Sequence, residues 1–267
     1  MKTILKISIF PALLLALAPA AYADSITLNS AGGTSTFTSG TLQFLGVAPL
    51  NADFPGNMYN SLVAPTSPTI TSGCIGGACG AGGLLITPGE SYSVDPEGVW
   101  ASVIQGSHWV TNSPDAGPAG PDSGTDGTVV DPNAFYYYQT TFTAVGGATP
   151  YDGSISVMAD DTAEVLLNGT VIVPFGIVGN DGHCSQYEPS CGAVDPVLLS
   201  DITLNAGTNT LTIIDAQTGG YGAGVDFSAT LTETPEPGSL PLLGAGLLGL
   251  AFVALQETKH LGTVLHS

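Results

Sequence analysis

Residues 160–173 read DDTAEVLLNGTVIV, two β-prone runs on either side of the pair Asn168-Gly169. An Asn-Gly pair between such runs is a strong hairpin signal, because a type I′ turn requires positive φ at both central residues. The stretch therefore predicts two antiparallel strands joined at this turn.

Short β-prone runs flank the hairpin on both sides. They lie at 25–28, 36–38, 41–44, 99–104, 108–110, 135–142, 155–159, 198–204, 210–215 and 225–231. Two stretches rich in Gly and Pro, 48–89 and 111–133, predict long loops or insertions. Short strands separated by turn signals predict an all-β domain over residues 24–234, built as an antiparallel β-sandwich.

The order of features between Tyr136 and Leu231 also matches a known family. An Ala-Asp turn leads into Val165-Leu166-Leu167-Asn168-Gly169, the run LNAGTNTLTI follows at 204–213, and a Gly-rich turn precedes the last strand. This order resembles the galactose-binding-like jelly roll. The resemblance implies a jelly-roll sandwich in which ligands meet the loops at one end or the concave face.

Two sets of side chains are candidates for binding such a ligand. Aromatic rings offer flat surfaces to sugar rings, and the candidates are Trp100, Trp109, Tyr136, Tyr138, Tyr187 and Tyr221. Polar partners or calcium ligands are expected among Asp160, Asp161, Asp215 and Asp226. Capping of a turn by the side chains is the simpler explanation for the first two aspartates.

Two classes of function fit this domain. The first is non-enzymatic binding of extracellular polysaccharide, with calcium as a possible cofactor. The second is a glycan-processing enzyme of the glycoside hydrolase type, which needs paired carboxylates. Glu164 is a candidate for such a role, although a solvent-facing position at the start of a hairpin strand also accounts for it. No G-x-S-x-G motif for a serine hydrolase is present, and we expect the protein not to be an enzyme.

The charge distribution excludes several other functions. Lys and Arg occur only at positions 2, 6 and 259, against 22 acidic residues and a net charge of −19. Nucleic-acid binding is excluded because phosphate neutralisation needs Lys or Arg. A P-loop is excluded because no Gly-Lys-Ser/Thr occurs. The carboxylates must be solvated, bonded to N–H groups or bound to a cation.

The four cysteines predict disulfides if the chain is exported. Local bridges from Cys74 to Cys79 and from Cys184 to Cys191 are the simplest of three connectivities. A zinc site that uses His183 and Cys184 is the alternative, but the spacings do not match a C-x-x-C knuckle.

Residues 1–23 have the features of a secretory signal peptide. Lys2 and Lys6 precede an apolar region, which ends in Ala21-Tyr22-Ala23, an A-x-A cleavage site. We expect the mature chain to begin near Asp24.

The other end of the chain carries a short motif on an apolar segment. Pro235-Glu236-Pro237 is followed by an uncharged run to Leu255, which as a helix reaches roughly 28 Å, about one bilayer core. This pairing resembles the PEP-CTERM sorting tail. The resemblance implies recognition by an exosortase, after export by the secretion machinery, and delivery to the cell surface or matrix. Residues 256–267 lack the terminal Arg or Lys cluster of such tails, and a plain membrane anchor is the alternative.

Overall fold

The structure is a computed structural model that describes residues 23–30, 42–49, 62, 64, 73–75, 84–86, 89, 91–96, 98–112, 118, 133–144, 150–177, 188–192, 194–218, 222–234 and 244–250. For residues 49, 73–75 and 84–86 it describes the backbone alone. The chain divides into two compact units. One is Ser25–Glu233, and the other is Met1–Asp24 together with Thr234–Ser267.

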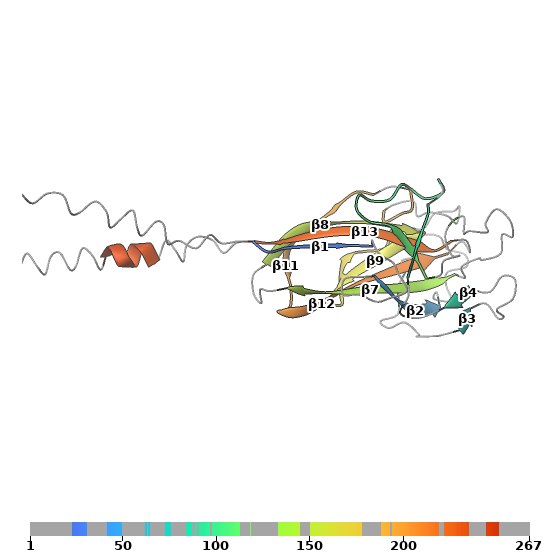
Figure 1. The fold of residues 1–267 in the computed structure, drawn as a ribbon, viewed down its shortest axis with the longest axis horizontal. Helices are drawn as coiled ribbons and strands as arrows, with labels where there is room; N and C mark the ends of the chain where they lie inside the picture. The colour runs from blue at the N-terminus through green and yellow to red at the C-terminus, as the bar shows by residue number, and fades with distance from the viewer. Residues whose placement is uncertain are drawn as a thin grey trace, which may run out of the picture. The chain divides into compact units, whose positions relative to one another are not determined.

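The unit Ser25–Glu233 contains two large antiparallel sheets in two layers (Figure 1). Sheet A has the strand order β11 (Val197–Thr203), β8 (Pro150–Asp160), β13 (Gly224–Glu233), β6 (Trp109–Thr111) and β5 (Tyr92–Val94), and β1 (Ser25–Asn29) also pairs with β13. Sheet B has the order β10 (Thr170–Val173), β9 (Thr162–Leu167), β12 (Gly207–Gln217), β7 (Ala134–Ala144) and β2 (Gln43–Pro49).

The chain crosses repeatedly between the two layers. Strands β7, β9 and β12 belong to sheet B, whereas β8, β11 and β13 belong to sheet A. Such alternation is typical of a jelly roll. The predicted fold class, an antiparallel β-sandwich, is therefore confirmed.

The predicted hairpin is present and closes as its sequence requires. Strand β9 pairs with β10, and the φ angles of Asn168 and Gly169 are 50° and 81°. The Asn168 side chain adds a further link, because its Nδ2 donates to Asn209 Oδ1 at 2.8 Å and its Oδ1 accepts from the Thr210 N–H at 2.9 Å. The turn is thus tied to the start of β12.

Apolar residues pack in three places. The largest cluster fills the space between the sheets and includes Phe44, Tyr136, Ile213 and Phe227. A second cluster, which includes Phe135, Tyr137 and Ile214, lies on the opposite side of sheet B, since these residues alternate along β7 and β12 with members of the first cluster. A third cluster, around Trp100, Trp109, Met158 and Cys191, lies by the same alternation on the outer side of sheet A.

Two predictions about elements need correction. The expected strand at 99–104 is absent, and residues 98–108 form turns and extended segments, which we call the strap. Its N–H groups bond to scattered acceptors, such as the Pro96 and Cys191 carbonyls, instead of a neighbouring strand. Within the expected loop at 48–89, β3 (Gly73–Ile75) pairs with β4 (Leu84–Ile86). The expected strand at 36–38 lies outside the described residues.

In the other unit, the described residues include a helical segment at 244–250 (Figure 1). Over the part of the chain that the structure describes, no helix has both the length and the apolar character needed to cross a membrane. The sorting motif Pro235, Glu236 and Pro237, the rest of the apolar run, and residues 1–22 of the signal peptide lie outside the described residues. Export and sorting therefore stay predictions.

Candidate functional site

The aromatic residues that the sequence nominates for ligand binding are core residues where they are described. Trp109, Tyr136 and Tyr138 each have 0% of their surface exposed. These three side chains are packed because both sheets are covered on both faces, so that the side chains on either face of a strand meet other apolar residues. Tyr187 and Tyr221 lie outside the described residues.

Trp100, the sixth aromatic candidate, attaches the strap to sheet A. Its Nε1–H donates to Asp160 Oδ2 at 2.6 Å, and its ring centroid lies 4.4 Å from that of Trp109. The ring lies against Gly224, where a Cβ atom would come within 2.7 Å of it. Gly224 pairs with Asp160 across the sheet, so the indole rests on a strand pair that offers both space and an acceptor.

Asp226 binds the strap at a second place, the backbone of Ile104. Its Oδ2 accepts from the Ile104 N–H at 2.8 Å, and its Oδ1 accepts from Ser30 Oγ–H at 2.9 Å. Burial raises the pKa of the Asp226 carboxyl, and hydrogen bonds from Ser107, Ile104 and Ser30 together with the nearby His108 oppose this effect. The carboxylate therefore serves to anchor backbone and side-chain donors.

The remaining two aspartates are also internal. Asp161 Oδ2 accepts from the backbone N–H and the hydroxyl of Thr218. Asp215 is 0% exposed and faces the space between the sheets, because its register partners Tyr136 and Ala163 belong to the cluster there. Among the described residues, no three His, Cys, Asp or Glu side chains gather as metal ligands do. Asp160, Asp161, Asp215 and Asp226, which were predicted as polar partners or calcium ligands, are thus not gathered into one metal site, and calcium binding stays a prediction.

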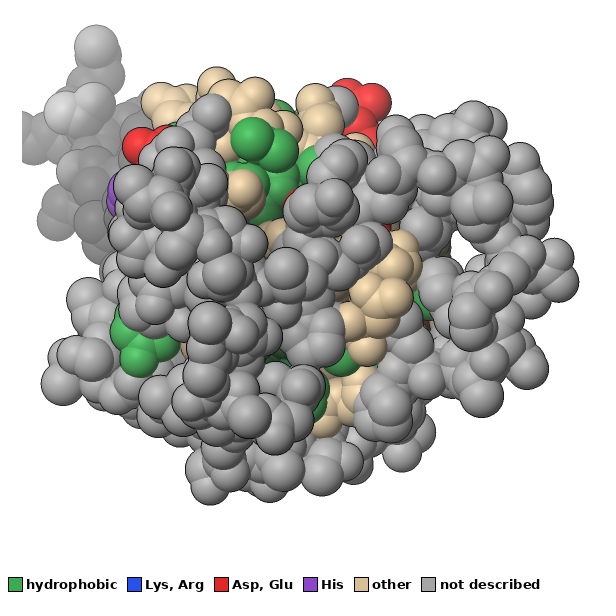
Figure 2. All heavy atoms as spheres, turned by 90° about the vertical axis from the view of Figure 1, so that its right-hand side faces the viewer, with side chains coloured by type: hydrophobic (Ala, Val, Ile, Leu, Met, Phe, Trp, Pro, Cys, Tyr) green, Lys and Arg blue, Asp and Glu red, His purple; other side chains and the backbone are tan. Residues whose placement is uncertain are grey.

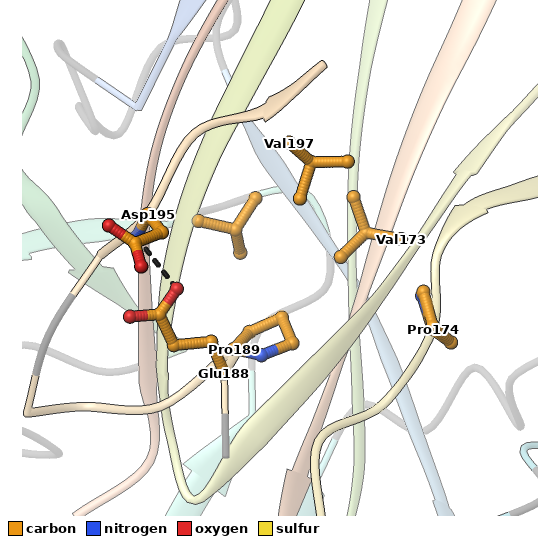
Figure 3. A pocket seen from close by; sticks show the side chains of 7 residues that line it. Val173, Pro174, Glu188, Pro189, Asp195 and Val197 are labelled. Atoms are coloured by element: carbon orange, nitrogen blue, oxygen red, sulfur yellow. Dashed lines mark hydrogen bonds between the residues drawn. The ribbon is translucent and has the colours of Figure 1, made fainter. Parts of the chain in front are cut away.

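A hollow of about 110 Å³ opens on the flank of the sandwich (Figure 3). It lies where β10 and β11, the end strands of the two sheets, approach one another. Its walls are mostly apolar, with two carboxylates, and the lining residues are Val157, Val173, Pro174, Glu188, Pro189, Asp195 and Val197. Val157 and Val173 also belong to the cluster between the sheets, so the hollow reaches down to the core.

The two carboxylates of the hollow lie together on one side of it, and Val173 and Pro174 lie on the other (Figure 3). The Asp195 N–H donates to Glu188 Oε2 at 2.7 Å, which fixes the Glu188 carboxylate beside that of Asp195. Both residues are exposed. Glu188 and Asp195 were not among the site residues predicted from the sequence. The available signal was that each acid precedes a proline, at 188–189 and 195–196, on either side of Cys191.

Glu164, the residue considered for catalysis, lies on the outer side of sheet B. Its partner across the sheet is Ile214, which in turn pairs with Tyr137. Burial raises the pKa of the Glu164 carboxyl. Burial, and to a smaller extent the charge of Glu164, raises the pKa of Tyr137 to about 12. Glu164 does not line the flank hollow, so the two acidic features are separate.

Of the four cysteines, Cys191 is the one whose side chain is described. It is 1% exposed, disulfide-bonded and part of the cluster beneath the strap. The side chains of Cys74, Cys79 and Cys184 lie outside the described residues. The pairing of Cys74 with Cys79 and of Cys184 with Cys191 therefore stays a prediction.

Comparisons with known proteins give distant structural likenesses. No family model and no curated protein matches the chain. A GH26-CBM35 β-(1,4)-mannanase from Podospora anserina shares 17% identity at a TM-score of 0.29, over 55% of this chain and 26% of that one. A family 35 carbohydrate-binding module from Clostridium thermocellum shares 13% identity at a TM-score of 0.26, over 53% of this chain and 97% of that one. A β-glucosidase from Kluyveromyces marxianus in complex with glucose shares 15% identity at a TM-score of 0.25, over 45% of this chain and 13% of that one. The matched part thus spans 26% of the mannanase and 13% of the β-glucosidase. At TM-scores this low, the three structures resemble this chain only in general.

Proposed function

We propose that this chain is an exported, non-enzymatic protein of the cell surface or matrix that binds polysaccharide through the flank hollow. The observation that carries the proposal is the composition of that hollow, in which apolar walls face two neighbouring carboxylates. Sugars present apolar C–H faces and hydroxyl donors. Apolar walls and carboxylate acceptors complement these two features.

The size of the hollow limits what it takes in. At about 110 Å³ it is smaller than small-molecule sites, which span roughly 300 to 1,000 Å³. It suits one sugar ring or part of a ring. Because the hollow is on an open flank between two edge strands, the rest of a polymer would continue into solvent. A terminal or branch sugar is the expected ligand.

The carboxylates favour binding over catalysis. A glycosidase needs one carboxyl group that holds a proton at its working pH, which enzymes achieve by placing that group in a buried site. Glu188 and Asp195 are both exposed. They are therefore suited to accept hydrogen bonds from a ligand.

The predicted export fits the same function. The signal peptide and the sorting tail would place the domain outside the cytoplasm, where polysaccharide is available, with secretion machinery and an exosortase as processing partners. Mass spectrometry of the protein from its host tests this part. A mature chain that begins near Asp24 and ends near residue 235 is expected, and recovery of both ends uncleaved contradicts it.

The binding test uses a glycan array, with and without calcium, together with hydrolysis assays on the same sugars. Val197→Asp places a charge in the apolar wall and is expected to abolish glycan retention. Leu198→Asp is the matched control, because Leu198 is 83% exposed and does not line the hollow. Equal retention by the two variants contradicts binding at the hollow. Turnover of a bound glycan contradicts the non-enzymatic assignment and favours the glycoside hydrolase alternative.

A further inference from the structure

The charge of the domain restricts which sugars can enter the hollow. No Lys or Arg lies between residues 7 and 258, and of the 22 acidic residues all but Asp24, Glu236 and Glu257 belong to the unit Ser25–Glu233. The described part of the face in Figure 2 shows a few acidic side chains and no Lys or Arg. Such a surface repels uronic acids and other anionic sugars.

The hollow concentrates this charge at one point. Glu188 and Asp195 are held side by side by the hydrogen bond from the Asp195 N–H to Glu188 Oε2. This bond uses one Glu188 oxygen as an acceptor, and both carboxylates line the hollow. Neighbouring acceptors of like charge are best matched by a cation with several N–H donors.

We propose that the flank hollow selects an amine-bearing sugar, a hexosamine without its acetyl group, in a polysaccharide. This inference rests on the proposed function. A protonated sugar amine has three N–H donors in a compact head, which can bond to both carboxylates at once. The adjoining ring carbons contact Val173, Pro174 and Val197. Acetylation removes the positive charge and two of the three N–H donors. It also adds an acetyl group, which needs more space in the hollow than the ammonium group does.

The experiment measures binding of glucosamine oligomers by calorimetry at about pH 6, where amines are protonated. N-acetylglucosamine oligomers and galacturonic acid oligomers of the same length are the comparison ligands. Glu188→Gln and Asp195→Asn each remove one charge from the hollow, and the amide introduced by Glu188→Gln retains an oxygen for the Asp195 N–H. The matched control is Asp201→Asn, an exposed acid on β11 four residues from Val197, or about 13 Å along the strand.

We expect each hollow variant to weaken glucosamine binding about tenfold or more, because a hydrogen bond to a charged group is lost. Asp201→Asn is expected to change binding less than about twofold, because the Debye length is near 8 Å at physiological salt. The acetylated oligomer is expected to bind at least about tenfold more weakly, and the acidic oligomer not at all.

Three results overturn the inference in distinguishable ways. Equal weakening by all three variants means that the net charge attracts amines without a site. Binding of acetylated oligomers that is as tight as that of glucosamine, and is lost in Val197→Asp, removes the amine selectivity but keeps the proposed function. Absence of any glycan binding that depends on the hollow removes both.

Discussion

Asp226 shows how one buried carboxyl group couples the strap to pH. Burial raises its pKa in the folded chain above the ordinary 3.8, so the folded state binds the proton more tightly than the unfolded state. Its contribution to stability is therefore complete below about pH 3.8 and is lost as the pH rises through the raised pKa. The contribution of Asp226 to the free energy of unfolding therefore decreases as the pH rises toward neutrality.

The variant Asp226→Asn tests the direction of this pH dependence of stability. Asparagine keeps one oxygen for the Ile104 N–H and cannot ionise. We expect the free energy of unfolding of the wild type, relative to this variant, to fall as the pH rises from about 4 to about 7. Urea titrations at several pH values measure it. A constant difference would show that the hydrogen bonds balance the effect of burial on the pKa, and a difference that grows with pH would show that they outweigh it.

The residue scale is also where sequence reasoning failed for the candidate site. A buried tyrosine and a sugar-stacking tyrosine look alike in an alternating strand, because alternation does not say which face packs against the other sheet. Tyr136 and Tyr138 lie in the cluster between the two sheets. Asn112 illustrates the same limit. It is 1% exposed, and its side-chain amide has no hydrogen-bond partner in the described structure, a situation that no local pattern indicates.

Among the elements, the pairing of β8 with β13 depends on close contact at one glycine. A Cβ atom on Gly153 would lie 1.9 Å from the Thr230 carbonyl oxygen, and Gly153 pairs with Leu231 in the longest ladder of sheet A. Gly153→Ala is expected to lower the free energy of unfolding by about 3 kcal/mol, because backbone must move. Gly192→Ala is the control, since its nearest contact would be an ordinary 3.7 Å. Chemical denaturation measures both, and equal costs would argue against this register.

The strap should depend more on Trp100 than on Trp109. The Trp100 indole donates to a buried carboxylate, whereas the Trp109 indole donates to the neutral Ala101 carbonyl at 2.9 Å. Hydrogen bonds to charged groups contribute about 1.5–3 kcal/mol, against about 0.5–1.5 kcal/mol for neutral ones. We therefore expect Trp100→Phe to destabilise by about 1 kcal/mol more than Trp109→Phe.

Both substitutions remove the same ring area and the same contact between indoles. The comparison thus isolates the two acceptors. Urea unfolding followed by far-UV circular dichroism gives the two free energies. A larger cost for Trp109→Phe would mean that ring packing, and not the bond to Asp160, holds the strap.

The elements that sequence predicted well are those with local causes. The Asn168-Gly169 turn and the long strands β7, β12 and β13 follow from alternation and turn chemistry over neighbouring residues. The strap does not, because its N–H groups bond to acceptors far along the chain, such as Asp226. The flank hollow joins β8, β10 and β11 with residues 188–195, and no contiguous motif encodes that meeting.

For the whole molecule, the dominant physical feature is unbalanced negative charge. The unit Ser25–Glu233 contains no Lys or Arg, so its carboxylates repel one another with only His108 and His183 as potential cations. In most proteins salt weakens ion pairs as well as repulsions, and the two effects partly cancel. In this domain repulsion between carboxylates is the main electrostatic interaction, so added salt should stabilise the fold.

We expect the melting temperature of residues 24–234 to rise by several degrees between about 10 mM and 300 mM sodium chloride at neutral pH, because a shorter Debye length weakens the repulsion. Differential scanning calorimetry measures it. The rise should shrink near pH 4, where many carboxyl groups are protonated. Calcium chloride at the same ionic strength is the second arm, and an additional rise would identify a specific cation site. A melting temperature that is insensitive to sodium chloride would show that the acids are spaced or bonded so that their repulsion does not limit the fold.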